Sequence, residues 1–320
     1  MKSARILKMV LNSYVAFKGT ASLYDAITDL NAGVKTSHTG LPVHQGFYYA
    51  FDSLITELRQ FVGELWGVSV IHCVGHSLGG AIATLAADWI KSSGHSAVVN
   101  LYTFGSPRVG LGRFAQKCTS RVSANNIYRV YHKIDPIPMV PTWPFAHAPN
   151  YGVDYLIHSP VSMPPWKYHF MEHYIKSVEK SSGWKSIANN RPQTYGQVTL
   201  ENWLSSDGIV SFSANTLQLL DAALVYVLEK VAHAVSIAVT GIVATGLTLL
   251  DRLAMILAEA ADVSADLSVW VYYLVRKMAA LVGVTIKKGS SLTVEFIRAI
   301  FIRLHQRISD MVLRIGRHIG

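Results

Sequence analysis

The chain has 320 residues, of which 50% are hydrophobic and only 15% charged, and its mean hydropathy is +0.27. Because roughly a quarter of the residues of an ordinary soluble domain are charged, we expect some apolar surface to contact lipid or a partner. The formal net charge of +9 favours an anionic partner, and the two cysteines, Cys73 and Cys118, do not imply a disulfide framework.

The first residues carry Lys2, Arg5 and Lys8, but the apolar stretch that follows is broken by Asn12 and Ser13. This pattern argues against a cleavable signal peptide. We therefore expect a cytoplasmic or membrane-associated location, with secretion by a non-classical route left open. The sequence does not indicate an oligomeric state.

Short β-rich runs alternate with helical runs over most of the first two thirds of the chain. This alternation predicts an α/β fold with a mainly parallel central sheet, in a domain that spans residues 1–205. The expected strands are residues 9–17, 68–74, 98–104 and 127–132, and the expected helices are residues 46–66 and 81–91.

The sequence changes character after Trp203, where residues 213–283 fit long helices rich in Ala, Val and Leu. Residues 231–250 carry no charged side chain apart from a titratable His233 and are long enough to span a membrane, although a buried hairpin helix has the same pattern. Residues 291–320 predict a basic amphipathic helix, which suits a membrane interface or a protein core. Residues 206–320 are thus predicted to be an all-α, membrane-associating region, with residues 213–320 as the lipid contact.

The segment Gly75-His76-Ser77-Leu78-Gly79 fits the pattern G-x-S-x-G, between an expected strand and a helical run. A turn of this kind holds the serine in strained backbone geometry and exposes its hydroxyl, and it needs small residues on both sides. The amide of Leu78 would lie at the helix N-terminus, where it can stabilise an oxyanion. Ser77 is therefore the candidate nucleophile.

A serine nucleophile needs a base, and the base needs an orienting carboxylate. The carboxylate follows the serine in chain order in this kind of fold. Asp135 comes directly after the strand expected at residues 127–132, in a proline-rich loop, and is the candidate acid. A turn-forming Asp before Pro is the other interpretation of this residue.

Several further motifs occur in an order that resembles the class 3 lipases, the family of the filamentous-fungal triacylglycerol lipases and related phospholipases A1. The match covers residues 9–176. Its motifs are Phe17-Lys18-Gly19-Thr20, Asp29-Leu30, His44-Gln45-Gly46-Phe47, Gly75 to Gly80, Tyr102 to Gly110, and Asp135-Pro136-Ile137-Pro138.

The resemblance implies an α/β-hydrolase that cleaves lipid esters without a metal or organic cofactor. It assigns Ser77 as nucleophile, Asp135 as orienting acid, and Thr20 as the second oxyanion donor beside Leu78. Bacterial members carry the base in a segment like H-S-M-x-x-Y, to which residues 169–174 correspond. We therefore favour His169 as the base, with His173 as the alternative; the tail has no counterpart in the family.

The resemblance does not decide whether this chain has a lid over its active site. In fungal members the helix after the first motif is an amphipathic lid carrying a Trp, whereas residues 22–29 have Ala26 at that place. Leu23, Tyr24 and Ile27 could still form a small apolar flap.

Two other functions are compatible with parts of the sequence. Residues 169–173 also read H-x-x-E-H, an inverted zinc-peptidase pattern that would need a third ligand such as Glu179 or Glu201. Alternatively, the helical region inserts into membranes and the hydrolase domain is accessory or inactive. A nucleic-acid partner is not expected, because the basic residues are scattered and no recognition motif occurs.

Overall fold

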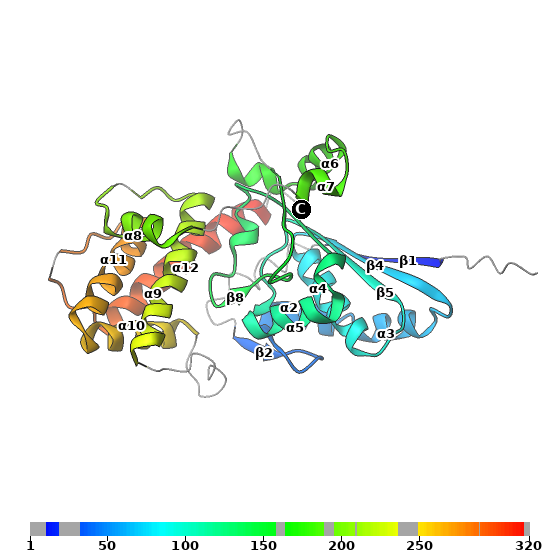
Figure 1. Cartoon of the computed structure of the whole chain (residues 1–320), viewed down its shortest axis with the longest axis horizontal. Helices are drawn as coiled ribbons and strands as arrows, with labels where there is room; N and C mark the ends of the chain where they lie inside the picture. The colour runs from blue at the N-terminus through cyan, green and yellow to red at the C-terminus, as the bar shows by residue number, and fades with distance from the viewer. Residues whose placement is uncertain are drawn as a thin grey trace, which may run out of the picture.

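The structure is a computed structural model of the chain and describes residues 11–18, 33–157, 164–188, 195–208, 210–235, 249–287 and 289–316. A five-stranded sheet forms the centre of its first part, residues 11–188, which we call the α/β unit (Figure 1). All neighbouring strands are parallel, in the order β1-β4-β5-β7-β9. The bounds are β1 Leu11–Phe17, β4 Val68–His76, β5 Val98–Phe104, β7 Ile127–His132 and β9 Tyr155–Ile157.

The predicted α/β class with a mainly parallel sheet is confirmed. The runs that favoured strands are strands here because β-branched and aromatic residues suit a pleated surface. In β4, Ile71 and Cys73 are fully buried on one face of the sheet, beneath the helix α4 (Leu78–Ser92). The carboxyl ends of the parallel strands lie at one edge, so the loops that follow β4, β5 and β7 meet there.

Helices α2 (Gln45–Asp52), α3 (Ile55–Gly63), α4 and α5 (Gly112–Val122) lie on the same face of the sheet (Figure 1). The prediction of one helix over residues 46–66 was wrong, because α2 ends before Ser53 and α3 begins after Leu54. The Ser53 hydroxyl donates to the Ala50 carbonyl and the Leu54 amide to the Phe51 carbonyl. These local bonds tighten the turn and end the helical ladder.

A second, antiparallel sheet lies beside these helices in the order β2-β3-β6-β8. It did not emerge from the sequence because each strand has only two or three residues, too few for a hydrophobic period. Its strands are β2 Val34–Thr36, β3 Pro42–His44, β6 Gly110–Leu111 and β8 Phe145–Ala146.

The other face of the large sheet carries a row of aromatic rings, one from each strand: Tyr14, His72, Tyr102, Tyr128 and Tyr155. Neighbouring ring centroids are 4.5 to 5.7 Å apart. Helix α7 (Trp184–Ala188) covers one end of the row, and α6 (Met171–Glu179) packs beside it. Cross-strand ring pairs of this kind stabilise the strand register.

Residues 195–316, which we call the helical unit, contain α8 Gln197–Ser205, α9 Ala214–Val235, α10 Leu249–Val263, α11 Ala265–Leu281 and α12 Val294–Gly316. The predicted all-α region is therefore present. Helix α8 packs on α9 and α11, so the boundary that we drew between residues 205 and 206 separates α8 from its packing partners. The division into two domains itself stays a prediction.

Among the residues that the structure describes, no helix combines the length and apolar character needed to cross a bilayer. Residues 236–248 lie outside them, so the span considered for residues 231–250 is not tested. Helix α12 has the amphipathic pattern expected from the sequence: Ile297, Ile300 and Leu304 are buried, while its arginines are exposed.

The helical unit is fixed to the α/β unit by a polar contact and by α12. A carboxylate oxygen of Asp221, on α9, lies 2.9 Å from Nη1 of Arg108 and accepts a bond from the Trp143 amide at 3.0 Å. Arg108 also donates to the Pro141 carbonyl at 3.3 Å. Helix α12 contacts the short 3₁₀ helix η3 (Pro165–His169). Both contacts reach loops that follow sheet strands.

Candidate active site

Ser77 lies at the turn between β4 and α4, in strained backbone geometry. Its φ of 55° and ψ of −128° are rare for a residue with a side chain. The turn is so tight that a Cβ on Gly75 would lie 2.1 Å from the Gly79 carbonyl oxygen, and a Cβ on Gly80 would lie 2.6 Å from the Ser106 Cβ. Gly75 is thus required by the close approach of the Gly79 backbone, and Gly80 by the close approach of the Ser106 side chain.

A continuous chain of side chains starts at this serine. His169 Nε2 lies 2.8 Å from Ser77 Oγ, and His169 Nδ1 lies 2.8 Å from Asp135 Oδ2. All three residues are buried: Ser77 is 2% exposed, and His169 and Asp135 are 0% exposed. The carboxylate can only accept, so Nδ1 carries the proton and Nε2 is left to accept from the serine hydroxyl. This arrangement can generate a serine alkoxide equivalent.

Asp135 is held by two further donors. Its Oδ1 accepts the Ile137 amide at 2.9 Å, and its Oδ2 accepts the Tyr174 hydroxyl at 2.6 Å. The Tyr174 oxygen in turn accepts the His132 amide at 3.2 Å. Burial and the neighbouring Asp135 raise the pKa of Tyr174 well above its usual value, so its hydroxyl stays a donor. Sequence reasoning gave Tyr174 no role, although it closes the motif that contains His169.

His76, the residue before the nucleophile, fixes the other side of the histidine. Its Nε2 donates to the His169 carbonyl at 2.7 Å, and the two ring centroids are 4.9 Å apart. Burial, followed by the proximity of His169, lowers the pKa of His76 to about 4. A neutral His76 therefore anchors the loop that carries His169 and adds no positive charge beside it.

Gly105, at the end of β5, lies where these groups meet. It has a φ of +56°, and a Cβ there would lie 2.8 Å from Asp135 Oδ2, 2.9 Å from the Tyr174 hydroxyl and 3.0 Å from His169 Nδ1. The glycine of the T-F-G motif thus leaves the space in which the acid, the tyrosine and the histidine converge.

Of the two expected oxyanion donors, Leu78 lies within the described residues and Thr20 does not. Leu78 is the first residue of α4, so its amide belongs to the turn that has no acceptor inside the helix, at the positive end of the helix dipole. Thr20, the second donor implied by the family resemblance, and the lid considered at residues 22–29 lie outside the described residues.

The structure supports neither His173 as the base nor a zinc site in the H-x-x-E-H segment. His173 lies on α6, beyond the 3₁₀ helix that carries His169, and its Nε2 is 3.3 Å from Glu172. Both ring nitrogens of His169 are already engaged by Ser77 and Asp135, so neither is left for a metal. Within the described parts of the chain, no three His, Cys, Asp or Glu side chains are arranged to hold a metal ion. The structure thus brings His169, and not His173, to Ser77.

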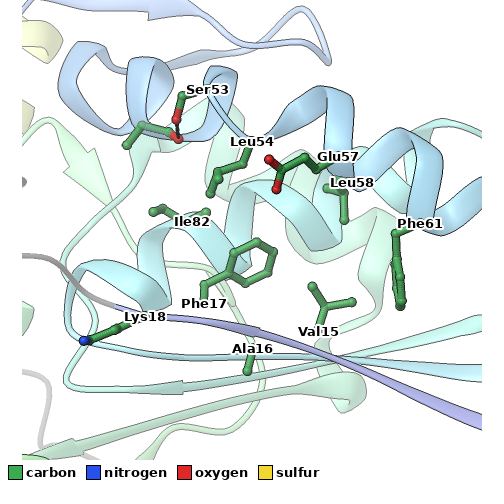
Figure 2. A pocket seen from close by; sticks show the side chains of 11 residues that line it. Val15, Ala16, Phe17, Lys18, Ser53, Leu54, Glu57, Leu58, Phe61 and Ile82 are labelled. Atoms are coloured by element: carbon green, nitrogen blue, oxygen red, sulfur yellow. Dashed lines mark hydrogen bonds between the residues drawn. The ribbon is translucent and has the colours of Figure 1, made fainter.

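A cavity of about 560 Å³ opens between β1, α3 and α4 (Figure 2). Phe17 and Val15 rise from β1 into it, and Leu54 and Phe61 point down from the α3 side. Phe17 pairs with Gly75 in the sheet register, two residues before Ser77. The cavity is therefore an apolar space that begins beside the nucleophile turn.

The sequence matches the family described as Lipase (class 3) over residues 14–145. The secreted mono- and diacylglycerol lipase 1 of Fusarium solani is 35% identical over 148 residues, which are 44% of this chain and 43% of that lipase. Toxin TseL of Vibrio cholerae is 37% identical over 118 residues, 36% of this chain and 18% of the toxin. A crystal structure of the lipase from Rhizopus microsporus var. chinensis aligns with a TM-score of 0.40 at 29% identity, covering 48% of this chain and 55% of that one.

The chain spans less than half the length of these curated relatives, and the match lies in the α/β unit. It contains the second half of β1, the nucleophile turn and the Asp135 loop, but it ends before His169 and the helical unit. The profile match and the identity to mono- and diacylglycerol lipases agree with the motifs found in the sequence. Residues 14–145 are thus similar to the class 3 lipase family.

Proposed function

We propose that the protein hydrolyses carboxylic esters of lipids, with Ser77 as nucleophile, His169 as general base and Asp135 as the acid that orients it. The single observation that carries this proposal is the buried chain from Ser77 Oγ through His169 to Asp135, joined by two 2.8 Å contacts at a strained strand-to-helix turn. The match of residues 14–145 to a lipase family model supports an ester as the substrate.

In the proposed reaction, His169 Nε2 takes the proton of Ser77 as the serine oxygen attacks the ester carbonyl. The Leu78 amide stabilises the oxyanion, together with the Thr20 amide or hydroxyl. Protonated His169 then gives its proton to the departing alcohol, which leaves an acyl-serine. A water molecule, deprotonated by His169, then attacks this acyl group. The bond between the acyl carbon and Ser77 Oγ breaks, His169 returns the proton to Oγ, and a fatty acid is released.

We place the acyl chain in the cavity between β1, α3 and α4. The cavity is lined mainly by apolar side chains, including Phe17, Leu54 and Phe61, and begins next to the nucleophile turn (Figure 2). Leu54→Trp should fill it and shift the preference towards short acyl chains. Thr56→Trp, on the exposed side of α3, is the matched control and should keep the original preference. An unchanged chain-length profile in both variants would place the acyl chain elsewhere.

The catalytic assignment is tested by labelling with a fluorophosphonate and by turnover of a short-chain ester. Ser77→Ala should abolish labelling and reduce turnover by at least about 1,000-fold. His169→Ala should reduce turnover similarly, whereas His173→Ala, four residues along, should change it by less than about threefold. Turnover that survives in Ser77→Ala, or a loss in His173→Ala equal to that in His169→Ala, would refute the assignment.

We also propose that residues 213–320 bring the enzyme to lipid surfaces. Support comes from the exposed arginines of α12 and the net charge of +9. The protein should sediment with vesicles that contain anionic phosphatidylglycerol and be released by salt. Sedimentation that is absent at low salt contradicts this proposal without affecting the catalytic one.

A further inference from the structure

A second cavity, of about 770 Å³, lies between α12 and the loops that carry Asp135 and His169. On the α/β unit its wall is made by Pro136, directly after Asp135, and by Trp166, three residues before His169. On the helical unit it is made mainly by α12 and by Phe212. The cavity is thus bounded by the two loops that carry Asp135 and His169, and all of its lining residues except Pro136 lie outside residues 14–145.

Three guanidinium groups line this cavity, those of Arg303, Arg307 and Arg314, against one carboxylate, that of Asp310. Arg303 and Arg307 lie one helical turn apart on α12, where two like charges repel. Within the described part of the chain, neither of these two arginines forms an ion pair. The cavity therefore carries an excess of positive charge, because, among the described residues on its wall, Asp310 is the one carboxylate against three guanidinium groups.

The residues that line the cavity hold the Arg307 side chain in place and add polar and apolar surface. The guanidinium carbon of Arg307 lies 5.2 Å from the centroid of the Phe212 ring, which holds the side chain against an apolar surface. Gln306 adds a neutral hydrogen-bonding group, and Trp166 and Met311 supply apolar surface. The cavity therefore combines planar cationic donors with apolar walls, as an amphiphilic anion requires.

Arginine recognises phosphate through paired N–H donors, and two arginines one turn apart can hold the two free oxygens of a phosphodiester. We propose that this cavity binds the phosphate of a glycerophospholipid whose ester is cleaved at Ser77. This inference rests on the proposed ester hydrolysis and narrows its substrate to an anionic phospholipid, in preference to a neutral acylglycerol. The acyl chain and the headgroup then occupy two separate cavities.

The test is the double variant Arg303→Gln/Arg307→Gln in the full chain, because both residues are exposed and their loss should not unfold α12. The control is Arg113→Gln/Lys117→Gln, which removes the same charge from the exposed side of α5. Three substrates are compared: dioleoylphosphatidylglycerol and dioleoylglycerol in the same neutral detergent micelles, and soluble p-nitrophenyl butyrate.

We expect kcat/KM of the Arg303/Arg307 double variant on the phosphatidylglycerol to fall at least about tenfold, mainly through KM, because a charge-assisted contact is lost. Its rates on the diacylglycerol and the butyrate ester should stay within about twofold, as should all three rates of the control variant. Equal losses on all three substrates would reduce the arginines to a structural role. An unchanged rate on phosphatidylglycerol, or an equal loss in the control, would refute the phosphate site.

Inorganic phosphate is the other ligand that two arginines in this cavity could bind. If millimolar inorganic phosphate inhibits turnover of all three substrates equally, and the Arg303/Arg307 double variant is resistant, the cavity is a site for free phosphate and the headgroup proposal is wrong. Inhibition confined to the phosphatidylglycerol supports the headgroup, because the two phosphates then compete for one place.

Calorimetric binding of soluble dihexanoylphosphatidylglycerol to Ser77→Ala separates the two proposals. If the unmodified protein cleaves none of the three esters, the proposed function fails. Binding that depends on Arg303 and Arg307 would even then support the phosphate site, and binding that is absent or independent of them would refute it.

Discussion

Gly105 marks the point at which three side chains of the site converge. Gly105→Ala should lower kcat by at least about 100-fold, because the new methyl group would displace Asp135, Tyr174 or His169 from hydrogen-bonding distance. Gly94 is the matched control: its φ of +81° is equally unfavourable for alanine, but a Cβ there contacts nothing within 4 Å. Gly94→Ala should cost about 1–2 kcal/mol of stability and leave kcat unchanged. Equal effects of the two substitutions on kcat would show that backbone strain, and not the collision, is responsible.

Tyr174 positions the acid, although it does not touch the substrate. Tyr174→Phe removes the 2.6 Å bond to Asp135 and leaves the His132 amide without that acceptor. A hydrogen bond to a buried charge contributes about 1.5–3 kcal/mol, so kcat should fall about tenfold or more while KM changes little. Tyr128→Phe, in the aromatic row at the start of β7 and away from the end that carries His132, should keep full activity. A Tyr174→Phe enzyme that matches Tyr128→Phe in kcat would remove Tyr174 from the site.

Buried neutral histidines make the stability depend on pH. Burial, as the largest cause, lowers the pKa of both His76 and His132 to about 4 from the ordinary 6.5. Between these values the unfolded chain binds more protons than the folded chain, so the free energy of unfolding falls as the pH falls from 6.5 towards 4. From pH 7 to pH 5 the loss should be about 1–2 kcal/mol for each histidine.

Urea unfolding at pH 7 and pH 5 measures this loss. His76→Gln removes one titrating group and keeps a side-chain amide that can donate to the His169 carbonyl, so the difference between the two pH values should shrink by about 1–2 kcal/mol. An unmodified protein that is equally stable at both pH values would show that the two histidines are not protected from protonation.

The sequence predicted the residues of the site better than their supports. Ser77 and Asp135 each follow a strand and lie in a short turn motif, so their places could be inferred from the strand pattern and the turn residues. His169 was preferred over His173 on the family resemblance alone. The contacts of Tyr174 with Asp135 and of His76 with the His169 carbonyl join residues 39 and 93 positions apart in the sequence, and no local pattern encodes such a distance.

At the scale of elements, the contact between α9 and the α/β unit contains one ion pair, Asp221–Arg108. Asp221→Ala should reduce the free energy of unfolding by about 2–4 kcal/mol, because Arg108, with only 10% of its side chain exposed, would keep an uncompensated charge. Asp207→Ala breaks another Asp–Arg pair, with Arg276, in which the carboxylate is 89% exposed. It should cost no more than about 1 kcal/mol. Urea midpoints that shift equally in both variants would contradict a special role for the Asp221 contact.

Strands were predicted from the sequence more accurately than the break between α2 and α3. Strands 98–104 and 127–132 were predicted to the residue, because β-branched and aromatic runs bounded by turn residues have few other structures. The break at Ser53 was missed because the apolar stripe continues through it, with Phe51 and Ile55 both buried in the same core. The hydrophobic period reports which face is buried, and it is insensitive to a one-turn interruption whose side chains still face the core.

At the scale of the whole molecule, most of the buried apolar residues form one continuous cluster across both units. It runs from Phe47 and Leu85 in the α/β unit to Leu224, Leu274 and Ile300 in the helical unit. A shared core predicts that the two units unfold together, whereas separate domains joined by a linker would unfold independently. This distinction decides whether the helical unit is an appendage or a structural part of the enzyme.

Hydrogen exchange at rising urea concentration can measure this cooperativity. Peptides from α4 and from α11 should lose protection at the same urea concentration, with equal opening free energies. Asp221→Ala should lower both values together, because the pair that it breaks contributes to the stability of one common folded state. If α11 opens first and α4 keeps its protection, the helical unit is a separate domain. The charged cavity between α12 and the catalytic loops would then persist only while that domain stays docked, and phospholipid turnover would fall at the urea concentration at which α11 opens.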